Sequence, residues 1–140
     1  MNGQTSIGER KIGGPGTRCY VVAELGVNHN GDEGLAMDMV REAARAGVDA
    51  VKVAAYTAAE FTTDTPYTYR TLGGTQERTE SQLVMFERLA LSYDTIVRLK
   101  RETKRLGLDF IVTATDALWV TRMAALGVDA FLLELGQLVV

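Results

Sequence analysis

Apolar runs alternate with amphipathic stretches along the chain. Each run is short and rich in valine, alanine or leucine, as expected for a strand that is buried on both faces. Four strands are predicted in this way, at Tyr20–Ala23, Val48–Val53, Leu108–Thr113 and Val128–Leu133.

The stretches between these runs have the spacing of helices. In Gly34–Ala46 the apolar residues fall three or four positions apart, which predicts one buried face made of Leu35, Met39, Ala43 and Ala46. Asp32 is placed to cap this helix, and Gly47 follows it as glycine follows many helices. A later helix should bury Ile96, Leu99, Thr103 and Leu106, and Asp116 should cap one that ends at Gly127.

One junction is used three times. The segments Gly47-Val-Asp-Ala-Val, Gly107-Leu-Asp-Phe-Ile and Gly127-Val-Asp-Ala-Phe each stop a helix, turn the chain and begin a strand. Repeated junctions of this kind indicate consecutive βα units in an all-parallel sheet.

The predicted fold class is therefore α/β, with parallel (β/α) units. A TIM-type (β/α)₈ barrel needs about 250 residues, so about four strands would make its first half. A doubly wound sheet is the alternative, but the first loop lacks the Gly-x-Gly-x-x-Gly of a dinucleotide site. Residues 18–140 are assigned to this partial barrel, and residues 1–17 to an arm, a small hairpin or a partly disordered leader.

The segment Tyr56–Thr79 is long, polar and rich in threonine. A connection of this length in a compact domain indicates a functional or a mobile loop. Directly after it, Thr79-Glu-Ser-Gln82 has the spacing of a capping box at the start of a helix.

Composition narrows the classes of function. With 140 residues and a net charge of −3, the chain shows no basic footprint for nucleic acid, and its apolar runs are too short to span a membrane. Cys19 is the only cysteine, which excludes an internal disulfide and favours the cytoplasm. His29 is the only histidine, so this chain cannot hold a multi-histidine metal site, and no metal ligand is assigned within it.

The first predicted strand leads into the candidate chemistry. Glu24 follows the apolar run, and a polar turn with Asn28 and His29 comes before Asp32. Parallel α/β folds bind ligands at the carboxyl ends of their strands, so Glu24 is expected at a site.

These residues carry a resemblance to a family. Ala23-Glu-Leu-Gly-Val-Asn-His-Asn-Gly-Asp32, Ala46-Gly-Val-Asp-Ala-Val-Lys52 and Glu80-Ser-Gln with Leu89-Ala-Leu-Ser92 resemble the sialic acid synthases, which include N-acetylneuraminate synthases and their 9-phosphate-forming relatives. The resemblance implies a (β/α)₈ barrel that condenses phosphoenolpyruvate with the open-chain aldehyde of an N-acetylmannosamine-type sugar. It makes the chain a candidate carbon–carbon bond-forming transferase of nonulosonic acid biosynthesis.

The resemblance also implies roles for single residues. Glu24 matches the strand-one carboxylate near the aldehyde or water, and Lys52 matches the strand-two lysine that contacts phosphoenolpyruvate. Thr113 matches a threonine that hydrogen-bonds the same substrate, while Asn28 and His29 would shape the rim of the site. A divalent metal, manganese or magnesium, is expected for the family, with ligands that are not in this chain.

Several positions depart from the family pattern. The glutamine after the strand-two lysine is replaced by Ala54, and Thr-Pro-Phe after strand three has become Thr113-Ala-Thr115. Leu132 stands in place of a strand-four lysine, and Leu135-Gly-Gln137 in place of Ser-Gly-Glu. Charge-assisted hydrogen bonds of this kind contribute about 1.5–3 kcal/mol each, so these changes weaken the phosphate grip.

Three functions therefore remain open from the sequence. The chain is the first half of a synthase-type site, a diverged half-barrel that binds or assembles without catalysis, or another aldol-type barrel with a phosphate ligand. A half-barrel leaves strand edges unpaired, which predicts a homo-oligomer or pairing with a missing second half.

Overall fold

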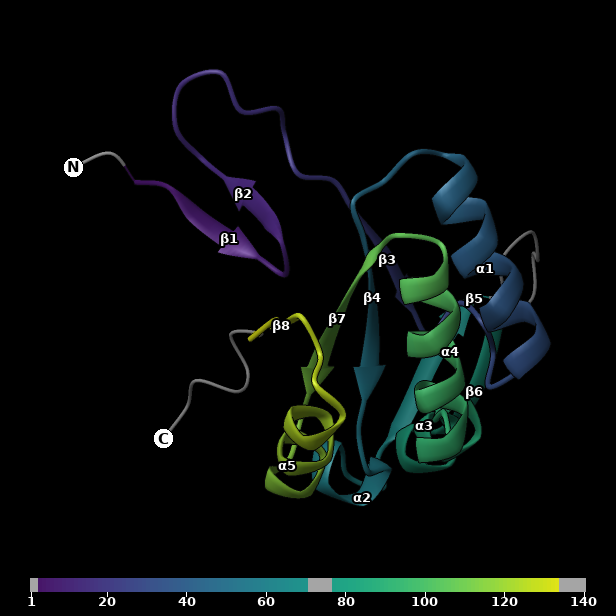
Figure 1. Cartoon of the computed structure of the whole chain (residues 1–140). Helices are drawn as coiled ribbons and strands as arrows, with labels where there is room; N and C mark the ends of the chain where they lie inside the picture. Colours follow the sequence, from purple (N-terminus) through teal and green to yellow (C-terminus); the bar gives the residue numbers. More distant parts are fainter. Residues whose placement is uncertain (1–2, 71–76, 134–140) are drawn as a thin grey trace.

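A sheet of four parallel strands forms the centre of the computed structural model, which describes residues 3–70 and 77–133 (Figure 1). Each strand pairs with the next one along the chain, which confirms the predicted series of parallel βα units. The strands are β3 (Val22–Gly26), β4 (Ala50–Ala55), β7 (Asp109–Ala114) and β8 (Ala130–Phe131). The helices are α1 (Glu33–Arg45), α2 (Ala58–Phe61), α3 (Gln82–Leu89), α4 (Tyr93–Arg105) and α5 (Ala117–Leu126).

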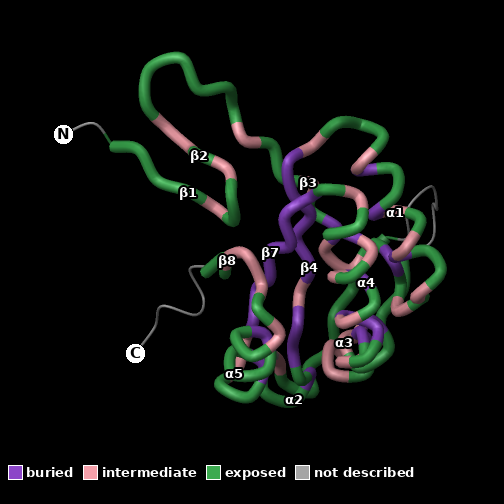
Figure 2. The backbone as a smooth tube through the Cα atoms, in the orientation of Figure 1, coloured by how far each residue is buried: buried purple, intermediate pink, exposed green. Residues whose placement is uncertain are grey.

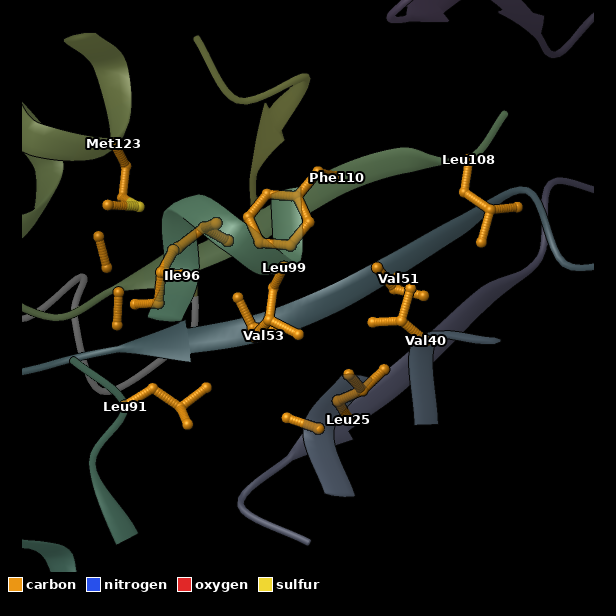
Figure 3. Close-up of a cluster of buried hydrophobic side chains, with 14 of the residues drawn as sticks. Leu25, Val40, Val51, Val53, Leu91, Ile96, Leu99, Leu108, Phe110 and Met123 are labelled. Atoms are coloured by element: carbon orange, nitrogen blue, oxygen red, sulfur yellow. The ribbon is translucent and has the colours of Figure 1, made fainter. Parts of the chain in front are cut away.

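The hydrophobic core lies between the sheet and the helices α1, α4 and α5. Side chains alternate along a strand, so every second residue of β4 and β7 points to this core. Figure 3 shows Phe110 and Val53 facing Ile96 and Leu99 of α4. Full burial of one such side chain contributes about 1.5–3 kcal/mol, which makes this face the main source of stability. Figure 2 shows the burial concentrated in the central strands.

Helices α1 and α5 begin directly after the capping residues predicted for them. Asp32 accepts a hydrogen bond from the Leu35 N–H at 2.8 Å, and Asp116 accepts one from the Trp119 N–H at 2.9 Å. Ser92 caps α4 in the same way. Gly127 ends α5 in the left-handed conformation, as expected for a glycine that follows a helix.

The first strand differs from its prediction. It covers Val22–Gly26 rather than Tyr20–Ala23, and it is not buried on both faces, because Val21 and Val22 are 46% and 41% exposed. Among the described residues β3 pairs only with β4, so it is an edge strand with one open flank.

The buried face of α1 also differs from its prediction. Ala36, Val40 and Ala43 are buried, whereas Leu35, assigned to that face, is 42% exposed. Both sets satisfy a spacing of three or four, and the rotation that brings small residues against the sheet is the one observed.

The segment predicted as one long loop contains regular structure. It holds α2 and an antiparallel hairpin of β5 (Pro66–Arg70) and β6 (Glu77–Ser81). Thr79 lies inside β6, so the predicted capping box is wrong, and Ser81 caps α3 by accepting the Val84 N–H. Cross-strand pairing outweighed the local signals, since facing threonines and charged pairs stabilise a polar hairpin.

The fourth strand is shorter than predicted. β8 covers two residues instead of Val128–Leu133, and Leu132 and Leu133 are exposed. Leu135 and Gln137, where the family pattern is lost, lie outside the described residues.

The amino-terminal segment includes a hairpin of β1 (Thr5–Ile7) and β2 (Arg10–Ile12). Arg10 ties it to the sheet domain, with hydrogen bonds of 2.7 Å to Asp49 and to the Gly107 carbonyl. The hairpin therefore lies at the amino end of β4 and β7 (Figure 1).

The repeated Gly-x-Asp junction has a physical basis at this end of the sheet. The Asp49 carboxylate accepts the Val21 N–H at 2.9 Å, and Asp129 accepts the Phe110 N–H at 2.8 Å. Burial opposes ionisation of Asp49, but this N–H bond and Arg18 outweigh burial and lower the pKa of its carboxyl group. Asp49 and Asp129 thus join neighbouring strands at their beginnings.

Candidate functional site

The carboxyl ends of β3, β4 and β7 meet at one edge of the sheet and border a pocket with a volume of about 180 Å³. Glu24, Lys52 and Thr113, which the sequence singled out, all line it. The other described lining residues are Gly26, Val27, Ala54, Tyr56, Phe86 and Thr115.

Glu24 and Lys52 are direct neighbours across two strands. Their Cα atoms are partners in the parallel register, and Lys52 Nζ lies 2.8 Å from Glu24 Oε1. The lysine side chain is only 5% exposed, while the glutamate side chain is 55% exposed. The pair therefore places a buried ammonium group at the base of the pocket and a hydrated carboxylate at its mouth.

A bulge in β3 sets the position of the carboxylate. Glu24 pairs with Lys52, but Gly26 pairs with Val53, so β3 carries one extra residue at Leu25. Gly26 has a φ of +53°, which favours glycine. Bulges of this kind redirect side chains, and this one lies between two residues that line the pocket, Glu24 and Gly26.

Thr113 reaches the same face from the third strand. The Cα partner of Lys52 is Ile111, and Thr113 lies two residues further along β7, on the same side of the sheet. Its side chain is buried, since the residue is 2% exposed. The site thus combines an ammonium group, a carboxylate and a hydroxyl group.

Thr115 adds a hydroxyl group that sequence reasoning did not assign to the site. Its Oγ1 is buried and has no hydrogen-bond partner among the described residues. A buried polar atom without a partner costs about 1–3 kcal/mol, so such atoms are rare unless a water or a ligand satisfies them.

Tyr56 and Phe86 form an aromatic wall of the pocket that the sequence did not predict. Their rings meet edge to face with centroids 5.7 Å apart, and the Tyr56 hydroxyl group donates to the Phe86 carbonyl at 3.1 Å. Burial raises the pKa of Tyr56 to about 12, so its hydroxyl group stays protonated. The two residues are thirty positions apart, and no local pattern connects them.

Asn28 and His29 do not line this pocket. The Asn28 side chain donates to the Leu25 carbonyl at 3.1 Å and faces a neighbouring cavity. His29 is 1% exposed, and its Nδ1 accepts the Gly31 N–H at 3.0 Å. Burial lowers the pKa of His29, an effect that a hydrogen bond with the Gly26 backbone partly offsets. In this structure the imidazole supports the turn from within.

The described residues do not fit a metal centre. No group of three or more histidine, cysteine, aspartate or glutamate side chains gathers in residues 3–70 and 77–133. Glu24 is the only carboxylate among the described lining residues of the pocket, and one monodentate group is a weak cation site. Cys19, the only thiol, is exposed near the opposite end of the sheet.

The described helices are also too short and polar to cross a membrane.

The chain matches known proteins along most of its length. Residues 39–136 match the model of the NeuB family. The chain is 29% identical over 138 residues to N,N'-diacetyllegionaminic acid synthase of Legionella pneumophila, covering 99% of this chain and 39% of that protein. It is 31% identical over 125 residues to the synthase of the same name from Campylobacter jejuni, covering 86% and 36%. An uncharacterized protein of Methanocaldococcus jannaschii is 30% identical over 132 residues, covering 94% and 35%.

Solved structures agree with these matches. The N-acetylneuraminic acid synthetase of Leptospira borgpetersenii superposes with a TM-score of 0.75 at 25% identity, over 94% of this chain and 41% of that one. The spore coat polysaccharide biosynthesis protein spsE of Bacillus subtilis, at 21% identity and a TM-score of 0.66, shares the fold over 91% of this chain and 32% of its own. The predicted partial α/β barrel is confirmed, and the chain spans somewhat more than a third of the curated relatives.

Proposed function

The chain belongs to the NeuB family, and we propose that it forms the phosphoenolpyruvate-binding part of a synthase site. Its relatives include sialic and legionaminic acid synthases. The observation that carries this proposal is the buried Lys52 ammonium group, held 2.8 Å from Glu24 where parallel strands end. The resemblance of both residues to the family motif supports the same role.

The proposed reaction joins phosphoenolpyruvate to the aldehyde of an N-acetylmannosamine-type sugar. C3 of the enol attacks the aldehyde carbon, water adds at C2, and phosphate leaves from the tetrahedral intermediate. Lys52 would balance the charge of the substrate phosphate or carboxylate, because a compact ammonium group suits an anion. The Thr113 hydroxyl group, on the same face, would donate a hydrogen bond to the same substrate.

Glu24 would act as the general acid or base, which donates a proton to the aldehyde oxygen or accepts one from the attacking water. Its half-exposed carboxylate lies beside Lys52, which leaves one oxygen for the aldehyde or the attacking water. A divalent metal is expected for the family, but the described residues form no cation site, so no step on this chain is assigned to a metal.

A second function stays in view, because some positions weaken the phosphate grip. Ala54 lines the pocket where the family has glutamine, and Leu132 is exposed where it has lysine. A half-barrel that binds phosphoenolpyruvate or assembles without condensing is therefore the alternative, and another aldol-type barrel with a phosphate ligand is the third. Binding without phosphate release would favour the alternative.

Within residues 3–70 and 77–133 the outer edges of β3 and β8 have no partner strand, which supports a proposal of assembly. Val21 and Val22 are exposed at the β3 edge, and Phe131, Leu132 and Leu133 are 38–64% exposed at the β8 end. We propose that these edges pair with further strands of a barrel, from a second copy or from the remainder of a synthase. A cytoplasmic setting suits the single exposed cysteine. A monomer by light scattering that binds no hydrophobic dye would argue against assembly.

The test measures binding and turnover separately. Calorimetry with phosphoenolpyruvate reports the Lys52 pocket, and phosphate release in the presence of N-acetylmannosamine and manganese reports condensation. We expect Glu24→Gln to keep phosphoenolpyruvate binding within about threefold and to lower phosphate release at least about 100-fold, the size of a general acid–base contribution.

Three outcomes decide between the functions. Release that depends on Glu24 supports the synthase, and binding without release supports the non-condensing half-barrel. Failure to bind phosphoenolpyruvate at millimolar concentration would reject both. Glu42→Gln is the matched control, because Glu42 is an exposed glutamate of α1, paired with Arg45 and away from the pocket.

A further inference from the structure

A second cavity lies beside the turn that follows β3. Its volume is about 570 Å³, and among the described residues only Val27 lines both this cavity and the pocket at the strand ends. Its polar lining consists of Asn28, Asn30, Tyr69, Arg70, Arg78 and Arg88, and no carboxylate of the described residues is part of that lining. The cavity is therefore basic, in a chain whose net charge is −3.

Three separate elements bring the arginines together. Arg70 and Arg78 come from the β5–β6 hairpin, and Arg88 comes from the last turn of α3, into which the hairpin leads (Figure 1). The turn after β3 touches the same helix, since a Cβ on Gly31 would lie 2.3 Å from the Arg88 carbonyl oxygen. The fourth wall, with Asn28 and Asn30, is thus fixed against the arginines.

Glu80 contacts two of the three arginines. Its side chain is only 12% exposed, and it accepts hydrogen bonds from the Tyr69 hydroxyl group and, at 2.8 Å, from Arg88 Nη2. Arg78 Nη2 lies 3.7 Å from its other oxygen. The Tyr69 hydrogen bond, followed by the two arginines, lowers the pKa of Glu80 and keeps it ionised. Before any ligand arrives, Arg88 is therefore held by a hydrogen bond, and Arg78 is drawn to the same carboxylate by a longer ion pair.

The charges of this cluster do not cancel. Three arginines face two glutamates, Glu80 and Glu77, the latter bound by Arg70 at 3.1 Å. Each guanidinium group carries several N–H donors in a planar fork. The contacts of Arg78 and Arg88 with Glu80 use one nitrogen of each guanidinium group, which leaves N–H donors on two residues that line the cavity.

We propose that this cavity binds the phosphate group of a small phosphomonoester, with Arg78 and Arg88 as its main contacts and Arg70 as a third cation. A guanidinium group can donate two parallel hydrogen bonds to two oxygens of a phosphate group. A phosphomonoester has three terminal oxygens and can therefore bind several guanidinium groups at once, whereas a carboxylate has only two oxygens. The proposal does not depend on condensation at the strand ends. The phosphate can belong to the sugar substrate or to a free phosphate ion, and the two sources are separable.

The test is a titration of the isotopically labelled 140-residue chain followed by NMR at low salt, with inorganic phosphate as the first probe. We expect the backbone signals of Asn28, Asn30 and Tyr69 to shift and to saturate. Arg78→Gln should weaken phosphate binding about tenfold. The affinity of Arg78→Lys should lie between those of the parent and Arg78→Gln, since lysine keeps the charge but lacks the planar fork of N–H donors.

Arg105→Gln is the matched control. Arg105 is an exposed arginine paired with Glu102 on α4, so the variant removes the same charge away from the cavity and should bind phosphate as the parent does. If Arg78→Gln and Arg105→Gln weakened phosphate binding equally, the loss would come from the net charge of the chain and not from the cavity, and the proposal would be overturned. Absence of any shift at Asn28 and Asn30 would also overturn it.

Two further ligands identify the source of the phosphate. If N-acetylmannosamine 6-phosphate binds at least about tenfold more tightly than inorganic phosphate, the site is assigned to a sugar phosphate. If the two ligands bind equally, the site is assigned to the free phosphate ion. Titrating phosphoenolpyruvate into the Lys52→Met variant separates the two sites. If this variant no longer binds phosphoenolpyruvate but still binds inorganic phosphate, the Lys52 pocket and the arginine cavity are independent sites, and each proposal is tested by its own variant. Phosphate binding lost in Lys52→Met but kept in Arg78→Gln would reject the arginine site alone.

Discussion

The central strands β4 and β7 are buried on both faces, but the two faces are chemically different. On the face covered by α1, α4 and α5, the strands present Val51, Val53, Phe110 and Val112, all 0% exposed. On the other face they present Lys52 and Thr113, which are 4% and 2% exposed. Apolar burial stabilises a fold, whereas a buried ammonium group opposes it unless it is paired. The second face therefore keeps polar groups at a cost in stability, as binding sites do.

The ends of the sheet differ in a related way. At the amino ends, Asp49 and Asp129 bind backbone N–H groups of neighbouring strands and the side chains of Arg10, Arg18 and Lys104. At the carboxyl ends, Thr115 Oγ1 lacks a hydrogen-bond partner among the described residues. Ion pairs and charged hydrogen bonds join the strands at one end, whereas a buried hydroxyl group at the other end can still accept or donate a hydrogen bond.

The largest effect should come from the apolar face. Phe110→Ala removes a fully buried ring between the sheet and α4, and we expect it to lower the free energy of unfolding by about 3–5 kcal/mol. Urea denaturation followed by circular dichroism measures this. Val120→Ala, at a position 42% exposed on α5, should change it by less than about 0.5 kcal/mol. A loss below about 1 kcal/mol for Phe110→Ala would mean that this face is not the source of stability.

A smaller effect on stability, with a large effect on binding, should come from the polar face. Lys52→Met keeps the volume of the side chain and leaves Glu24 hydrated, because that carboxylate is 55% exposed. We expect the free energy of unfolding to change by less than about 1 kcal/mol, and phosphoenolpyruvate binding to fall below detection by calorimetry.

The control for this variant is Lys11→Met in the amino-terminal hairpin, which is exposed and far from the pocket. It should keep both stability and binding. If Lys52→Met unfolded the chain as Phe110→Ala does, the two faces would not differ as described.

The smallest effect concerns pH. Because burial lowers the pKa of His29 below its ordinary value of 6.5, the unfolded chain takes up this proton at a higher pH than the folded chain. Stability contributed by the neutral imidazole is therefore present above about pH 6.5 and is lost as the pH falls toward the folded pKa. Since His29 is the only histidine, its Cε1 proton gives one NMR signal, and we expect a midpoint below 6.5.

His29→Gln tests the same linkage on stability. The difference in unfolding free energy between this variant and the parent should shrink as the pH falls below about 6.5. A midpoint at or above the ordinary value would contradict the link between burial and charge at the turn.

Much of the fold follows from local patterns in the sequence. The three Gly-x-Asp junctions predict parallel βα units, and Asp32 and Asp116 begin their helices as expected. These signals are local, since a helix cap or a junction involves a few consecutive residues. The proximity of Glu24 and Lys52 also follows, because both were expected near the ends of neighbouring parallel strands, and the structure pairs them within β3 and β4.

Tertiary structure decided the features that join distant segments. The β5–β6 hairpin, the rotation of α1 and the exposure of Val22 in β3 contradict local expectations, because they depend on which surface each segment meets. Tyr56, Phe86 and Thr115 enter the pocket, and the arginines gather beside it, only once the chain is folded. The sequence alone determined which strands carry the charged and hydroxyl groups of the site. Packing over long sequence separations decided what surrounds those groups, since contacts of that kind leave no periodic trace along the chain.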